Sequence, residues 1–292
     1  MPPHLGISTW VWSSPADDAL LARLIPLIAE MGFDVVEIPV ETLNQFDVGK
    51  ARALADAAGL GVSICAVIGP GRDLMLEDEV KIGLAYLRGC IDIAHELGSP
   101  AVAGPFYSAV GRCWAMSSAE RKRELDRLAD LLRDLGAYAA RRGVELGIEP
   151  LNRFETSFIN TTAQALELVE RVDHPAVGIA LDSFHMGIEE KSLGEAIRLA
   201  EGRLKHVQVA ENDRGTPGTG QLDWGGFASA LSDVDYRGRV VIETFSDRVE
   251  AIARAAAIWR PLAADSDTLA REGLAFLRGL FRCGTGNRAS TR

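Results

Sequence analysis

Residues Gly147–Arg153 read G-I-E-P-L-N-R, and this stretch organises the interpretation of the whole chain. The preceding residues 144–146 are Val-Glu-Leu and follow a segment with helical spacing, a pattern typical of the end of a buried strand. Because burying an unpaired carboxylate is costly, Glu149 needs a cation, a hydrogen-bond donor or a raised pKa. The stretch therefore predicts a buried strand whose end carries an acid that requires a partner.

The same pattern occurs twice more along the chain. The run V-G-I-A-L-D ends at Asp182, and the run V-V-I-E ends at Glu243. Three strands that end in acids indicate one shared site, and a hard divalent metal is the simplest ligand for three carboxylates. The alternative is that each acid caps a neighbouring helix or pairs with an arginine.

Strand-like and helix-like segments alternate along the sequence. Strands are expected over residues 5–12, 34–41, 62–68, 101–106, 204–210 and 240–245, with two more ending at Glu149 and Asp182. Helices are expected from 17 to a stop at 32, over 48–58, from about 80 to 98, after 117, after 161, and over 192–200, 227–234 and 248–281. Eight such pairs predict a closed parallel (β/α)8 TIM barrel, whose sites lie at the C-terminal ends of its strands.

The barrel is expected to form a single domain over residues 1–282, followed by a disordered tail over 283–292. A doubly wound sheet is the alternative, but it would need a G-x-G-x-x-G turn after the first strand, and the sequence has none.

Composition excludes several classes of protein. The 292 residues carry a net charge of -10, which argues against a nucleic-acid-binding or anionic-membrane surface. The four cysteines show no C-x-x-C spacing, as expected for free thiols in a reducing compartment. The first residues contain no basic segment followed by a long apolar run, so neither a signal peptide nor a membrane span is predicted, and a cytoplasmic location is expected.

The predicted seventh strand reads K-H-V-Q-V-A-E and should contribute to the same site. Since side chains alternate along a strand, His206 and Gln208 point the same way. A histidine nitrogen or an amide oxygen could each reach the metal, and the sequence leaves this choice open.

Further polar and aromatic residues follow the predicted strands. Glu155 and His185 each come a few residues after a strand-end acid, where they could hydrogen-bond a polyol. Arg214, in the glycine-rich loop after the seventh strand, could neutralise an oxyanion near the metal. Trp114 could line a sugar site or pack in the core, and Cys65 could line the pocket or act as a small buried hydrophobic residue.

These motifs resemble those of a known family, the ketose 3-epimerases (D-tagatose and D-psicose 3-epimerases) of the sugar phosphate isomerase/epimerase barrel superfamily. The resemblance extends from about residue 6 to residue 278. It is most specific in G-I-E-P-L-N-R-F-E-T (147–156), L-D-S-F-H-M-G-I-E-E-K (181–191), E-N-D-R-G-T-P-G-T-G (211–220), V-I-E-T-F (241–245) and G-P-F-Y-S-A-V-G-R-C-W (104–114).

The resemblance implies a divalent metal cofactor, Mn²⁺ above all, with Mg²⁺ or Co²⁺ as alternatives. It implies that Glu149 and Glu243 form the acid/base pair. It also implies substrate contacts by Glu155, His185 and Arg214. The expected partner is a small-molecule ketose, and the expected assembly is a homodimer or homotetramer.

One position departs from the family pattern. Where the 3-epimerases have H-x-H in the seventh strand, this chain has His206-Val207-Gln208, so Gln208 stands at the ligand position. An amide oxygen can ligate a hard cation, which keeps the expected ligand set at Glu149, Asp182, Gln208 and Glu243. The H-x-Q pattern of this chain resembles the corresponding strand of hydroxypyruvate isomerase-like members of the superfamily.

The expected function is therefore metal-dependent inversion of C3 in a free ketose of the D-tagatose, D-psicose, D-fructose or L-ribulose type. The reaction would pass through an enediolate between two opposed glutamates. The alternatives are a hydroxypyruvate isomerase-like aldose–ketose isomerase, a keto-inositol dehydratase, and a non-catalytic sugar-binding barrel.

Overall fold

The computed structural model describes residues 2–66, 68–245, 253 and 257–283. Its centre is a closed barrel of parallel strands in the order β1-β2-β3-β4-β5-β6-β7-β8, and β1 pairs with β8 to close the ring. The strands are β1 (His4–Ser8), β2 (Val35–Val40), β3 (Gly61–Ala66), β4 (Ala101–Gly104), β5 (Glu145–Ile148), β6 (Val177–Asp182), β7 (Leu204–Val209) and β8 (Arg239–Ile242). The predicted single-domain TIM barrel is confirmed.

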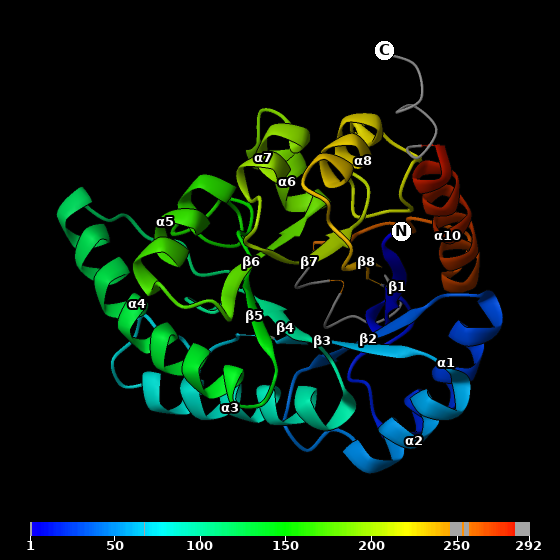
Figure 1. Cartoon of the computed structure of the whole chain (residues 1–292), viewed down its shortest axis with the longest axis horizontal. Helices are drawn as coiled ribbons and strands as arrows, with labels where there is room; N and C mark the ends of the chain where they lie inside the picture. The colour runs from blue at the N-terminus through cyan, green and yellow to red at the C-terminus, as the bar shows by residue number, and fades with distance from the viewer. Residues whose placement is uncertain (1, 67, 246–252, 254–256, 284–292) are drawn as a thin grey trace.

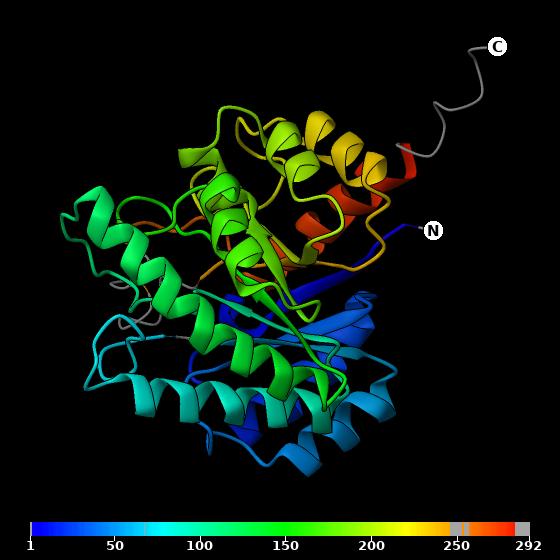
Figure 2. The ribbon, with the colours of Figure 1, turned by 60° about the vertical axis from the view of Figure 1, so that its left-hand side comes forward.

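Helices surround the strands, as both views show (Figures 1 and 2). They are α1 (Asp18–Met31), α2 (Val48–Ala58), α3 (Val80–Leu97), α4 (Ser118–Ala140), α5 (Thr162–Val172), α6 (Ser183–Glu189), α7 (Leu193–Leu199), α8 (Trp224–Asp233) and α10 (Ser266–Cys283), with a short 3₁₀ helix η1 (Thr9–Val11) after β1. No helix in the described ranges is both long and apolar enough to cross a bilayer.

Local sequence signals define most helix ends. Ser117 and Thr161 form the predicted capping boxes with Glu120 and Gln164, which satisfy the backbone N–H groups of the first turns of α4 and α5. Gly32 ends α1 with a φ of 95°, a left-handed conformation that glycine adopts without steric cost. These signals act within a few residues, and for this reason the sequence reveals them.

Other boundaries differ from the expectation. The first strand ends at Ser8, whose hydroxyl oxygen accepts a hydrogen bond from the N–H of Trp10 and caps η1, rather than continuing to residue 12. Helix α6 directly follows Asp182 in a segment for which no helix was expected. Helix α8 begins at Trp224 instead of residue 227 because Asp223 caps it.

The last predicted helix, 248–281, is too long. Residues 257–265 form turns and bends, and Pro261 lacks the N–H that a helix interior requires. Helix α10 begins only at Ser266, where the Oδ1 of Asp265 accepts a hydrogen bond of 2.7 Å from the N–H of Thr268. Residues 248–252 and 254–256, like most of the predicted tail (284–292), lie outside the described residues.

The strand register brings the candidate residues to one end of the barrel. Asp182 of β6 is level with Gln208 of β7, which in turn is level with Val241 of β8. Glu149 directly follows β5, and Glu243 directly follows β8. Since all eight strands are parallel, these positions share the C-terminal mouth of the barrel, whose core consists of buried apolar side chains.

Candidate active site

Three acids gather at the C-terminal mouth of the barrel, as their positions at strand ends predict. Glu149 is 4% exposed, Asp182 1% and Glu243 3%. They come from β5, β6 and β8, so the site spans nearly half of the ring. Acids buried this deeply require positive charge, hydrogen-bond donors or protons close by.

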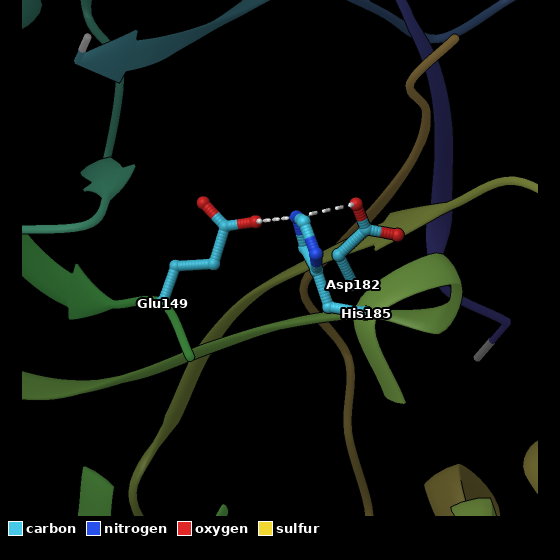
Figure 3. Close-up of side chains that lie close together, drawn as sticks. All are labelled: Glu149, Asp182 and His185. Atoms are coloured by element: carbon cyan, nitrogen blue, oxygen red, sulfur yellow. Dashed lines mark ion pairs between the residues drawn. The ribbon is translucent and has the colours of Figure 1, made fainter. Parts of the chain in front are cut away.

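His185, from α6, lies between two of these acids (Figure 3). Its Nε2 is 3.6 Å from Oε1 of Glu149 and 3.8 Å from Oδ2 of Asp182. One potential ligand atom from each of these three residues lies within 4.8 Å of the others, close enough to hold a metal ion together.

The other ring nitrogen of His185 determines what Nε2 can do. Nδ1 accepts a hydrogen bond of 3.1 Å from the backbone N–H of Asn152 and lies 2.9 Å from the Asn152 side-chain nitrogen. Burial lowers the pKa of His185, against the opposing effect of Asp182, so the ring is neutral near pH 7. In a neutral ring whose Nδ1 accepts, Nε2 carries the proton. His185 therefore presents a donor to Glu149 and Asp182, rather than a lone pair to a metal.

Arg214 supplies positive charge to the same group. Its guanidinium donates to the carboxylate of Asp182, and its Nη2 lies 2.9 Å from Oε2 of Glu243. The guanidinium also lies over the rings of Phe184 and Phe245, at 4.4 and 4.9 Å from the ring centroids. Arg214 thus bridges two of the three acids.

Asp182 also caps a helix, as the alternative interpretation proposed. Its Oδ1 accepts a hydrogen bond of 2.9 Å from the N–H of Phe184 in the first turn of α6. The two interpretations are compatible, because Oδ1 is used for the cap while Oδ2 faces Arg214 and His185.

On β7, the two candidate ligands meet a fourth acid, Glu37 of β2. The Nε2 of His206 lies 2.7 Å from Oε2 of Glu37. Gln208 donates from Nε2 to Oε1 of Glu37 at 2.9 Å and to Oε1 of Glu243 at 2.7 Å. Its Oε1 is buried and has no hydrogen-bond partner among the described residues. An unpartnered buried amide oxygen beside an acid cluster is what a site for a hard cation would present.

The pKa values reflect the shortage of positive charge. Burial, followed by the neighbouring Asp182, raises the pKa of Glu149 well above its ordinary value. Burial also raises the pKa of Glu243, although Arg214 acts against this. Burial would raise the pKa of Asp182 too, but Arg214 and His185 hold it below its ordinary value. The cluster would therefore gain from a further cation.

Comparison with known proteins identifies the family of the chain. A family model described as "Xylose isomerase-like TIM barrel" matches residues 25–280. The chain belongs to this family. A ketose 3-epimerase from Arthrobacter globiformis is 34% identical to it over 282 residues, covering 94% of this chain and 95% of that protein.

Solved structures of related enzymes share the fold of this chain. The structure of an L-ribulose 3-epimerase superposes with a TM-score of 0.91 at 29% identity, covering 99% of this chain and 100% of that one. A D-allulose 3-epimerase from Methylomonas sp., in complex with D-allulose, superposes with a TM-score of 0.89 at 29% identity, covering 95% of this chain and 97% of that one. This member of the xylose isomerase-like family is an isomerase, like its relatives.

The remaining predicted residues of this xylose isomerase-like barrel, Glu155, Cys65 and Trp114, differ in what they contact. Glu155 accepts a hydrogen bond of 2.8 Å from the Asn152 side chain and so joins the His185 side of the cluster. Cys65 is buried on β3, and its thiol pKa is raised by burial and by the charges of nearby acids, first Glu243. Trp114 stacks on Phe158 with ring centroids 6.1 Å apart, so this contact belongs to the packing between the β4–α4 loop and the loop before α5.

The sequence reasoning missed two residues. Glu37 lies inside β2, in the apolar run V-V-E-I-P-V, and is fully buried. Its signal was an acid within a strand, whereas only acids at strand ends were considered. Asn152 belongs to the quoted motif, but its role depends on contact with a histidine 33 positions away.

Proposed function

We propose that the protein is a metal-dependent 3-epimerase of free ketoses of the D-tagatose, D-psicose, D-fructose or L-ribulose type. The observation that carries the proposal is the pair of buried glutamates, Glu149 and Glu243, three strand positions apart on the ring. Two carboxyl groups on different sides of a bound sugar allow a proton to leave one face and return to the other.

The residues of the site fit a divalent cation. Glu149, Asp182 and Glu243 supply carboxylate oxygens, and Gln208 supplies the unpartnered Oε1. These are hard oxygen donors of the kind that Mn²⁺ and Mg²⁺ accept. When bound, the cation supplies Lewis acidity that makes the C3 proton of a ketose easier to remove. His206, by contrast, is engaged with Glu37, which supports Gln208 as the ligand from β7.

Proton transfer is the task of the two glutamates. One of them takes the proton from C3, and the electron pair of the broken C–H bond enters an enediolate. The other, protonated, returns a proton to the opposite face of C3 and so inverts that centre. Arg214, held by Asp182 and Glu243, places a fixed positive charge beside the negative intermediate.

The hydrogen bonds of His185 and Glu155 support roles in binding the sugar. His185 offers its Nε2–H, and Glu155, a partly exposed residue held by Asn152, offers a carboxylate oxygen. Both groups suit the hydroxyl groups of a polyol. The sequence contains no dedicated basic cluster for a phosphate, which supports a free sugar. The expected cytoplasmic location, the homodimer or homotetramer and the preference for Mn²⁺ remain predictions.

One observation favours a second candidate. Gln208 replaces the histidine of the H-x-H pattern, as in the hydroxypyruvate isomerase-like members of the superfamily. An aldose–ketose isomerase moves a proton between neighbouring carbons and needs only one base, so the second buried glutamate argues for epimerisation.

NMR in deuterated water tests the proposal. The Mn²⁺-loaded enzyme is incubated with each of the four ketoses and with hydroxypyruvate. We expect a product inverted at C3, with deuterium bound to C3. Deuterium at C1 of the ketose, or conversion of hydroxypyruvate alone, would replace the proposal by aldose–ketose isomerisation.

A further inference from the structure

Glu37 is a buried charge that the proposed reaction does not use. It lies in the middle of β2, and its side chain is fully buried. Because burying a carboxylate without partners costs several kcal/mol, its surroundings should show what it is paired with. Its two described hydrogen-bond partners both belong to β7.

The contacts of Glu37 cross the barrel interior. In the closed ring, β2 and β7 are separated by β1 and β8. Oε2 of Glu37 is 2.7 Å from Nε2 of His206, and Oε1 is 2.9 Å from Nε2 of Gln208. His206 and Gln208 project to the same side of β7, so one carboxylate holds both.

The amide of Gln208 is thereby fixed in one orientation. Its Nε2 has two hydrogens, which point to Oε1 of Glu37 and to Oε1 of Glu243. Exchanging the positions of Nε2 and Oε1 would turn Nε2 away from both acids and lose both of these hydrogen bonds. The observed orientation leaves Oε1 buried and without a partner in the described part of the chain.

Glu243 alone would not fix this orientation as firmly. One hydrogen bond leaves the amide free to rotate about its last side-chain torsion, which is broad for glutamine. A second acceptor on a different strand removes that freedom. His206 contributes by occupying the other oxygen of Glu37, which keeps the carboxylate from turning away from Gln208.

We propose that Glu37 is a positioning residue that fixes the Gln208 amide so that its Oε1 serves as a metal ligand. This inference rests on the proposed function, because it concerns the cation site of that reaction. Residues that orient ligands typically change metal affinity 10- to 100-fold when they are replaced. In this chain, where an amide stands in the place of an imidazole, the orienting group also decides which end of the side chain meets the cation.

A double-mutant cycle on Mn²⁺ binding tests the proposal without measuring activity. Mn²⁺ dissociation constants are measured by isothermal titration calorimetry for the wild type, Glu37→Met (which removes both acceptor oxygens), Gln208→Ala and the double variant. We expect Glu37→Met to weaken binding at least about 10-fold when Gln208 is present and less than about 3-fold when residue 208 is already alanine. Glu145→Gln is the control, since it removes a carboxylate that pairs with Lys205 in the same barrel, and it should leave the affinity within about 2-fold.

The outcomes of the binding experiment distinguish a failure of this inference from a failure of the proposed function. Unchanged Mn²⁺ affinity in Glu37→Met would overturn this inference and leave the proposed function standing. An equal loss in both backgrounds would also overturn it, because Glu37 would then act through its charge and not through Gln208. A wild-type protein that bound no divalent cation would overturn the proposed function itself, and this inference with it.

A crystal structure of the Mn²⁺-loaded wild type tests the geometry with no variant at all, should Glu37→Met not fold. We expect Oε1 of Gln208 within bonding distance of the ion, about 2.2 Å, while Nε2 still contacts Glu37. An ion liganded by His206, or an Nε2 that has left Glu37, would contradict the inference.

Discussion

At the scale of the residue, the proposed reaction depends on the carboxyl groups of Glu149 and Glu243. Replacing either by glutamine keeps an oxygen that can ligate a cation and removes the proton acceptor. We expect turnover to fall about a thousandfold or more, with the cation still bound at lower affinity. Steady-state kinetics on the ketose identified by NMR measure this. Glu195→Gln, an exposed change on α7, is the control, and near wild-type rates in either site variant would rule that residue out as the base.

Gln208→His tests the departure from the family pattern. An imidazole fits the same strand position but has a softer nitrogen ligand and only one N–H to share between Glu37 and Glu243. We expect the affinity for Zn²⁺ and Ni²⁺ to rise relative to Mn²⁺ and Mg²⁺, in keeping with ligand softness. Competitive metal titrations on folded protein measure the ratio. A ratio that does not change would show that residue 208 is not a ligand.

At the scale of the element, the loop between β7 and α8 depends on Glu211. Its two oxygens accept hydrogen bonds from the N–H groups of Asn212, Gly218 and Leu222 and from Nε1 of Trp224, at 2.9 to 3.2 Å. In Glu211→Gln, an amide nitrogen would face N–H donors in a buried position. We expect a loss of about 1 to 3 kcal/mol in the free energy of unfolding, measured with urea at pH 7.

The effect of Glu211 should also depend on pH. Burial alone would raise the pKa of Glu211, but its four donors hold it below the ordinary value of 4.5. Its stabilisation is therefore present above pH 4.5 and is lost as the pH falls below that value. The difference between the wild type and Glu211→Gln should shrink when the urea series is continued to pH 4. Asp213→Asn, in the same loop, removes only an exposed pair with Arg260 and should cost less than about 1 kcal/mol. A difference that stays constant with pH would contradict the assignment.

The helices and strands also show how much of the structure the sequence could predict. Caps such as those of Ser117 and Thr161 act within three residues, and strand-end acids reveal themselves where an apolar run stops. Glu37 was not predictable in the same way, because its meaning depends on partners 169 and 171 positions later in the chain. The choice between His206 and Gln208 also depends on Glu37, since both project to the same side of β7. The start of α10 was missed because the apolar pattern before Pro261 resembles a helix, whereas the proline and the Asp265 cap decide the boundary.

At the scale of the whole molecule, the proposed function makes the barrel dependent on a cation. Purified protein should hold about one divalent ion per chain, and exhaustive chelation should abolish turnover and lower the melting temperature. Ligand binding at 100 times the dissociation constant contributes about 2.7 kcal/mol of stability, so readdition of Mn²⁺ should restore both properties. Elemental analysis, calorimetric melting and the NMR assay measure them. Full turnover after chelation would contradict the proposed metal dependence.

The link between β2 and β7 has a consequence for the nascent chain. At about 5 to 20 residues per second, the ribosome finishes Gln208 roughly 10 to 35 s after Glu37. During that interval the carboxylate of Glu37 has neither of its partners, and enclosing it would cost several kcal/mol. We expect β1–β6 to remain an open, protease-sensitive sheet until β7 emerges, which pulse proteolysis of ribosome-stalled chains ending before and after β7 would show. The acid that orders the finished site would thus also delay the closure of an incomplete ring.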